Sequence, residues 1–229
     1  MPSAKITTTT PFADYQFKVQ SKNQQGLSEW SMNSAAAQFN YNKATGGTIT
    51  TNDNYNGTGE KWQIHTFKSN GTFTVSENPQ PFRYMVVAGG SGGSTEYGGK
   101  TYGGQSVWTD AGTLAVGPHT VTIGNGANGA VRPGDWTTAA TGGPGGATNL
   151  GTIQAKGTGT NSGITPRQVT SNISGASVLY GSDNTSNRNN ESSFLPGEAG
   201  QKAGAHNTPI GPNGRRGTNG IVVVAFRIG

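Results

Sequence analysis

The segment GPNGRRGTNG, residues 211–220, has a glycine at every third position. A polyproline II helix has three residues per turn, so Gly211, Gly214, Gly217 and Gly220 would share one edge of such a helix. An edge without side chains lets two backbones approach closely and hydrogen-bond to each other. The segment therefore predicts a ladder of structural glycines packed against a neighbour. A collagen-like triple helix is the alternative, but four glycines give too few triplets for it to stand alone.

The same spacing recurs in several other stretches of this chain, which has 38 glycines among 229 residues. Glycine buries little apolar area and loses more backbone entropy on folding than other residues. We therefore expect backbone hydrogen bonds between loops, or association with other chains, to stabilise a thin core. The repeated pairs are Gly89/Gly92, Gly90/Gly93, Gly126/Gly129, Gly142/Gly145 and Gly143/Gly146.

Segments with β-strand patterns separate the glycine-rich stretches, and no segment has convincing helical periodicity. Asn70-Gly71 predicts a hairpin turn, and Gly117-Pro118 predicts another turn. The long apolar runs at 82–88 and 221–228 are typical of buried strands, and we expect them in one sheet. The predicted fold class is all-β: a β-sandwich-like scaffold with long glycine-rich loops of polyglycine or polyproline II type. The other expected strands are 47–51, 62–67, 72–75, 106–108, 112–116, 119–123 and 152–156.

The N-terminal residues 1–32 differ from the rest of the chain. Apolar and polar residues alternate over Tyr15–Val19, residues 23–26 predict a turn, and residues 27–31 predict a returning strand. PFADYQFKVQSKNQQGLSEWS resembles the last hairpin of a fibronectin type III domain, in which Tyr15 would be the tyrosine-corner residue. Two strands alone are marginal in water, so we interpret the hairpin as a remnant, as a strand donor to a neighbouring chain, or as a free-standing decoration.

A second resemblance covers roughly residues 44–229. The string GGTIT…WQIHTFKSNGTFTV…FRYMVVAGGSGG…GTLAVGPHTVTIGNGA…GTNGIVVVAFRIG resembles the glycine-rich C-terminal domain of tail proteins from bacteriophages of actinobacteria. That domain often follows fibronectin type III modules, and family members often carry pure-glycine runs, which Asn, Thr and Ser interrupt here. The predicted organisation is a partial fibronectin-like hairpin at 1–32, a linker at 33–45 and a glycine-rich β domain at 46–229.

The resemblance implies a minor tail, tail fibre or tail-tip protein, located in the tail of the virion. We expect a non-enzymatic adhesin that attaches to a host cell-surface glycan or protein, contacts other tail proteins and forms a homotrimer. The alternatives are a structural tail or baseplate component that contacts only other tail proteins, and a surface-glycan depolymerase.

Aromatic residues within the glycine-rich loops are the candidate host-binding residues, because a flat apolar face stacks on sugar rings and anchors interfaces. Trp108 lies next to a predicted strand, so core packing and binding are equally open for it. Arginines at 215–216 are candidate contacts for anionic surface polymers. The expected host-binding residues are Tyr97, Tyr102, Trp136, Arg215 and Arg216.

The chain carries no motif that predicts a catalytic, cofactor or metal site. A phosphate-binding loop ending at Gly99-Lys100-Thr101 would need glycine at position 94, which is Ser94. The three histidines have no metal-ligand spacing, and the chain has no cysteine. The net charge of +5 comes from scattered basic residues, which predicts no nucleic-acid partner. We likewise expect no membrane insertion, because no run of about 18 apolar residues occurs.

Overall fold

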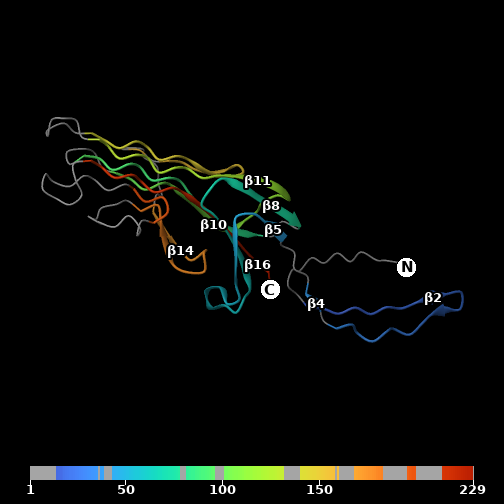
Figure 1. Ribbon diagram of the computed structural model, residues 1–229. Helices are drawn as coiled ribbons and strands as arrows, with labels where there is room; N and C mark the ends of the chain where they lie inside the picture. The colour runs from blue at the N-terminus through green and yellow to red at the C-terminus, as the bar shows by residue number, and fades with distance from the viewer. Residues whose placement is uncertain are drawn as a thin grey trace.

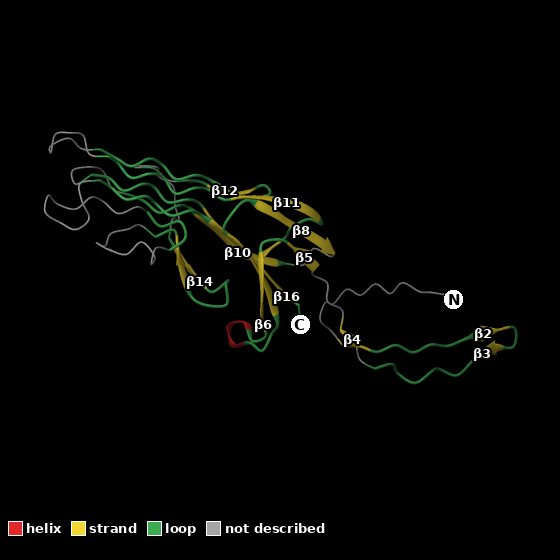
Figure 2. Ribbon diagram, in the orientation of Figure 1, coloured by secondary structure: helices red, strands yellow, loops and turns green. Residues whose placement is uncertain are grey.

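The structure, a computed structural model, confirms the predicted all-β class (Figures 1 and 2). Among the described residues, every regular element is a strand except one 3-10 turn, η1 (Tyr55–Gly57). The structure describes residues 14–35, 37–38, 43–77, 81–95, 101–131, 140–157, 159, 168–182, 195–199 and 213–228.

Two five-stranded antiparallel sheets form a sandwich. The first sheet has the strand order β10 (Ser106–Gly112), β9 (Phe82–Val87), β16 (Ile221–Arg227), β7 (Trp62–Phe67) and β6 (Thr48–Asn52). The second has the order β13 (Ile153–Ala155), β12 (Thr148–Leu150), β11 (Gly117–Thr122), β8 (Gly71–Glu77) and β5 (Lys43–Thr45). Alternating apolar residues from both sheets fill the core between them, including Phe73, Val75, Phe82, Leu150 and Phe226.

Strand β16 is the centre of the first sheet and pairs with β7 on one side and β9 on the other. This pairing confirms the expectation that the two long apolar runs share a sheet. Val222 and Val224 point into the core between the sheets, whereas Ile221 and Val223 point to the opposite face. Both faces of β16 are therefore buried, which is why its sequence is a continuous apolar run and does not alternate.

A second apolar cluster covers the outer face of the first sheet. The hairpin of β14 (Val169–Ser171) and β15 (Val178–Tyr180) lies over this face, together with η1. Tyr55 of η1 and Ile173 of the hairpin are almost fully buried there, against Met85 of β9. The sandwich thus has a third layer, which the polar sequence of residues 158–219 did not predict.

Three local predictions were wrong. The segment after β7 does not make a hairpin at Asn70-Gly71, because β7 and β8 lie in different sheets and residues 68–70 cross between them. Gly117 and Pro118 begin β11 and are not a turn between strands. The sequence predicted two strands, at 106–108 and 112–116, but residues 106–112 form one edge strand with a bulge between Thr109 and Gly112, and residues 113–116 are not in a strand.

The N-terminal residues form the predicted hairpin, which lies away from the sandwich in Figure 1. Strands β2 (Lys22–Asn23) and β3 (Gly26–Leu27) flank its turn, and β1 (Asp14–Tyr15) pairs with β4 (Ala37–Gln38) at its base. Between them, Ser28, Ser31 and Ser34 pair with Ser21, Val19 and Phe17 at 2.9 Å. Each of these three serine hydroxyls also accepts the backbone N–H of its partner, so one arm advances three residues for every two of the other.

Candidate functional site

Glycine-rich segments leave one end of the sandwich and run together as a bundle, drawn as green loops in Figure 2. Apart from 195–199, each described segment continues from, or leads into, a strand at the same end of the two sheets, such as β9, β11 and β16. We call residues 88–95, 101–105, 123–131, 140–147, 195–199 and 213–220 the glycine bundle. The bundle is built on backbone contacts, because the segments themselves are not strands.

Segment 88–95 lies at the centre of the glycine bundle, and all of its residues are buried. Its backbone amides donate to three neighbours in turn, so every third residue faces the same neighbour. This period of three is that of a polyproline II helix. The donor–acceptor pairs, at 2.7–3.0 Å, are Ala88–Gln105 and Ser91–Tyr102 on one face, Gly89–Gly146, Gly92–Gly143 and Thr95–Ala140 on the second, and Gly90–Thr218 and Gly93–Arg215 on the third.

The glycines of the bundle are required by the closeness of its backbones. A Cβ added at Gly89, Gly90 or Gly92 would overlap the backbone carbonyl of Asn125, Glu198 or Asn128. Gly143 is an exception, since a Cβ there would meet only the Ala127 side chain at 3.7 Å. The other bundle glycines whose Cβ would overlap a neighbouring backbone are Gly103, Gly104, Gly124, Gly126, Gly129, Gly142, Gly145, Gly197, Gly214, Gly217 and Gly220.

The glycine ladder at 211–220 lies within this packing. The amides of Gly214, Gly217 and Gly220 donate to Ala130, Ala127 and Gly124 at 2.9 Å. Gly217 and Gly220 are buried, and Gly214 is half-buried. Gly211 lies outside the described residues.

The far ends of the bundle segments are held together by hydrogen bonds. Thr95 donates its backbone N–H to Ala140 (2.9 Å), and Ala130 donates to Gly93 (2.7 Å). Gly214 in turn donates to Ala130. These residues mark one layer, which we call the distal end of the bundle. Residues 96–100, 132–139 and 200–212, which adjoin bundle segments in the sequence, lie outside the described residues.

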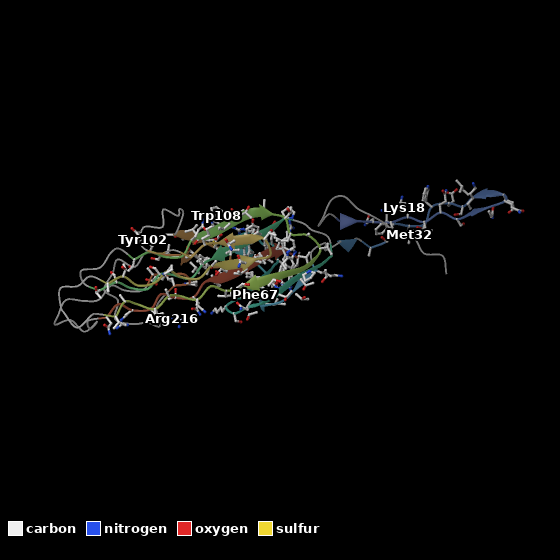
Figure 3. All side chains as sticks on the ribbon, turned by 90° about the horizontal axis from the view of Figure 1, so that it is seen from above. Lys18, Met32, Phe67, Tyr102, Trp108 and Arg216 are labelled. Carbon is white, nitrogen blue, oxygen red and sulfur yellow. The ribbon has the colours of Figure 1, made fainter. Side chains whose placement is uncertain are left out.

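The described candidate binding residues do not form one cluster. Tyr102 is half-buried, and its backbone N–H donates to Ser91 Oγ at 2.9 Å. Arg216 is exposed, and its Nε donates to the carbonyl oxygen of Gly126 at 3.1 Å. Figure 3 shows Tyr102 and Arg216 on opposite sides of the bundle. Arg215 is half-buried beside Gly93, whose amide binds its carbonyl oxygen.

Two of the candidate residues, Tyr97 and Trp136, lie outside the described part of the chain. In the sequence, Tyr97 follows Thr95 by two residues, and Trp136 lies between Val131 and Ala140. For these two residues the binding role stays a prediction.

A polar cluster on the outer face of the sandwich was missed by sequence reasoning. Arg83 Nε donates to Asp110 Oδ1 (2.7 Å), Nη1 donates to the Tyr55 hydroxyl (2.9 Å) and Nη2 donates to Asn172 Oδ1 (3.2 Å). The Tyr55 hydroxyl donates onward to the carbonyl oxygen of Ile173 at 3.1 Å. The partners come from widely separated segments and form no motif, so no sequence signal pointed to them.

Among the described residues, burial shifts the pKa values of three groups. Burial raises the pKa of the Tyr55 and Tyr180 hydroxyls above the ordinary tyrosine value. Burial lowers the pKa of His65, whose Nδ1 lies 2.7 Å from the Gly46 carbonyl oxygen. His65 is completely buried between Phe73 and Phe226, so it is a core residue of β7.

The described residues contain no group of three or more His, Cys, Asp or Glu side chains that could hold a metal ion. Within the same residues, no helix has the length and apolar character needed to cross a membrane. Comparison with known proteins assigns the chain to no family, since no family model and no curated protein matches it.

Proposed function

We propose that this chain is a non-enzymatic bacteriophage tail fibre or tail-tip protein that attaches to the host cell surface through the distal end of the glycine bundle. The observation that carries the proposal is the hydrogen-bonded layer of Thr95, Ala130, Ala140 and Gly214. Segments 88–95, 123–131, 140–147 and 213–220 all begin or end within two residues of these hydrogen bonds, so the chain enters or leaves the bundle there at neighbouring positions. Such an arrangement lets connecting loops vary in sequence while the backbone below them holds its place, which suits recognition.

Tyr97, Tyr102 and Trp136 are the proposed anchors, and Arg215 and Arg216 are the proposed charged contacts. Because Tyr102 and Arg216 lie on opposite sides of the bundle (Figure 3), these two would contact the host surface at separate points. Aromatic rings stack on the apolar faces of sugars and provide large contact areas at low entropic cost. A homotrimer would carry three copies of this surface, and simultaneous attachment would strengthen a weak single contact through high effective concentration.

A structural tail component is the second candidate, and one observation favours it. The N-terminal hairpin exposes Val19, Leu27, Trp30 and Met32, with Met32 91% exposed. Four large apolar side chains on one small element indicate a surface that packs on a partner. The hairpin would then bind a neighbouring tail protein or a second copy of this chain.

Purified protein binding to whole host cells, together with the position of the chain in intact particles, tests the proposal. We expect cell binding and a distal, exposed position in the tail. A chain enclosed within the tail, with no cell binding by the purified protein, would support the structural candidate. Release of reducing sugar from host envelope would instead support a depolymerase.

A further inference from the structure

A groove of about 360 Å³ opens on the outer face of the sandwich, beside the Arg83 cluster. Its floor and walls come from β9, the edge strand β10 and the β14–β15 hairpin. Trp108 lies opposite Met85 in the pairing of β10 with β9, so its side chain is on the outer face of the sheet with Arg83. The residues that matter here are Arg83, Trp108, Asp110, Thr170, Asn172 and Ser177.

The indole of Trp108 is the apolar surface of this groove. Trp108 is 47% exposed, although it lies on a strand of the sandwich (Figure 3). A core tryptophan would be covered, so this side chain contributes little to the packing of the sheet. An accessible indole beside fixed polar groups is the combination that small-molecule sites use for affinity and orientation.

The polar groups of the groove are held in position before any ligand binds. The side chain of Arg83 is only 16% exposed, and its guanidinium binds Asp110, Tyr55 and Asn172. Both of its contacts with Asp110 use Oδ1, and the Asp110 side chain is 59% exposed. Asp110 therefore presents hydrogen-bond acceptor capacity to the groove, and its orientation is fixed by Arg83.

We propose that this groove binds a neutral sugar, with a pyranose ring stacked on Trp108 and its hydroxyl groups bound by Asp110 and Asn172. Sugar rings have an apolar C–H face and a rim of hydroxyls, which match an indole bordered by a carboxylate and an amide. Thr170 and Ser177 add hydroxyl groups to the wall of the groove.

The charges of the groove favour a neutral sugar over an acidic one. The positive charge of Arg83 is already paired with Asp110, so no free cation faces the groove among these residues. An incoming uronate would meet the exposed carboxylate of Asp110 and would be repelled by it. The volume is enough for one or two rings, because small-ligand sites of roughly 300–1,000 Å³ enclose molecules of that size and larger.

This proposal does not depend on a role in a phage tail. It concerns the side of the sandwich, whereas host attachment is assigned to the distal end of the glycine bundle. Binding of a soluble sugar is measured without cells or particles, so the two proposals fail separately.

Nuclear magnetic resonance of the indole N–H groups, titrated with defined trisaccharides, tests the groove. The neutral probes are maltotriose, cellotriose and mannotriose, and the acidic probe is trigalacturonate. The indole signal of Trp108 is assigned by its loss in Trp108→Phe. We expect a neutral probe to shift this signal while the signal of Trp30, on the hairpin, stays in place.

Three variants of the groove and one control variant have distinct expected affinities. Trp108→Ala should weaken binding about tenfold or more, which corresponds to roughly 1.4 kcal/mol, whereas Trp108→Phe should retain most of it. Asp110→Asn should weaken binding to the neutral probe. Trp30→Ala is the matched control for loss of an exposed tryptophan and should bind as the wild type does.

Three outcomes would overturn the proposal. The first is that none of the neutral probes shifts the Trp108 signal. The second is that Trp108→Ala, shown to be folded by its unchanged melting temperature, binds as well as the wild type. The third is that trigalacturonate binds more tightly than the neutral probes.

Discussion

Gly142 lies so close to Gly92 that a Cβ added to Gly142 would overlap the Gly92 backbone. The next residue, Gly143, accepts a hydrogen bond from the Gly92 amide at 3.0 Å but has room for a Cβ. These adjacent glycines belong to the same bundle segment, and neither has a positive φ. They form a matched pair for measuring what close backbone packing contributes to stability.

Gly142→Ala should lower the free energy of unfolding by about 2–3 kcal/mol, because the added methyl forces two backbones apart. Gly143→Ala should be neutral or stabilising by up to about 1 kcal/mol, since alanine restricts the unfolded chain. Urea unfolding of both variants checks this. Equal, small effects would mean that the bundle is loosely packed.

The ladder at 211–220 allows the same comparison with a bulkier residue. Gly214→Val should destabilise the domain by a few kcal/mol, because its Cβ would overlap the backbone of Gly93. Arg215→Ala is the control and should change stability much less. Thermal unfolding of the two variants distinguishes a packed ladder from a solvent-exposed loop, in which both changes would be tolerated.

The Tyr55 hydroxyl joins the third layer to the sandwich through its hydrogen bonds with Ile173 and Arg83. Tyr55→Phe removes the hydroxyl between Arg83 and Ile173, which leaves a buried carbonyl without its donor. We expect a loss of about 1–3 kcal/mol. Hydrogen exchange should become faster in residues 169–180 and stay unchanged in β16. Uniform loss of protection in both regions would show that the layer is not a separate unit.

Burial of His65 predicts a pH dependence of stability. Its pKa is lowered in the folded protein, so below about pH 6.5 the unfolded chain binds a proton that the folded protein does not. The stability that comes from keeping His65 neutral is fully present above about pH 6.5. As pH falls through the window between the ordinary pKa and the lowered one, stability should decrease by up to about 1.4 kcal/mol per unit. His65→Gln, which keeps an N–H donor for Gly46, should flatten this slope between pH 7 and 5, whereas an unchanged slope would assign it to other groups.

Much of the scaffold could be predicted from local patterns, but the pairing of its parts could not. The alternation of Phe73 and Val75 indicated a strand, yet Asn70-Gly71 is a local signal that says nothing about which sheet the next strand joins. The three-residue glycine spacing predicted backbone edges without side chains, but many segments have such an edge. The sequence of one segment therefore does not show which other segments it packs against.

The groove beside the Arg83 cluster could not be predicted from the sequence for a different reason. Arg83 is 27 residues from Asp110 and 89 residues from Asn172 in the sequence. Each residue is ordinary in its own segment, and only the bulged edge strand and the covering hairpin bring them together. The sequence left open whether Trp108 packs in the core or binds a partner, and its exposure shows that it is not a core residue.

The distal end of the bundle is tested most directly by adsorption to host cells. The variant carries alanine at Tyr97, Tyr102 and Trp136, and the control is Val116→Ala, which changes an exposed apolar residue of the sandwich. If the distal end binds the host, the triple variant should lose most cell binding per intact particle, while particle assembly and melting temperature stay near wild type and the control binds normally. Normal adsorption by the triple variant, or loss of binding only through failed assembly or a sharply lowered melting temperature, would contradict the proposed attachment site.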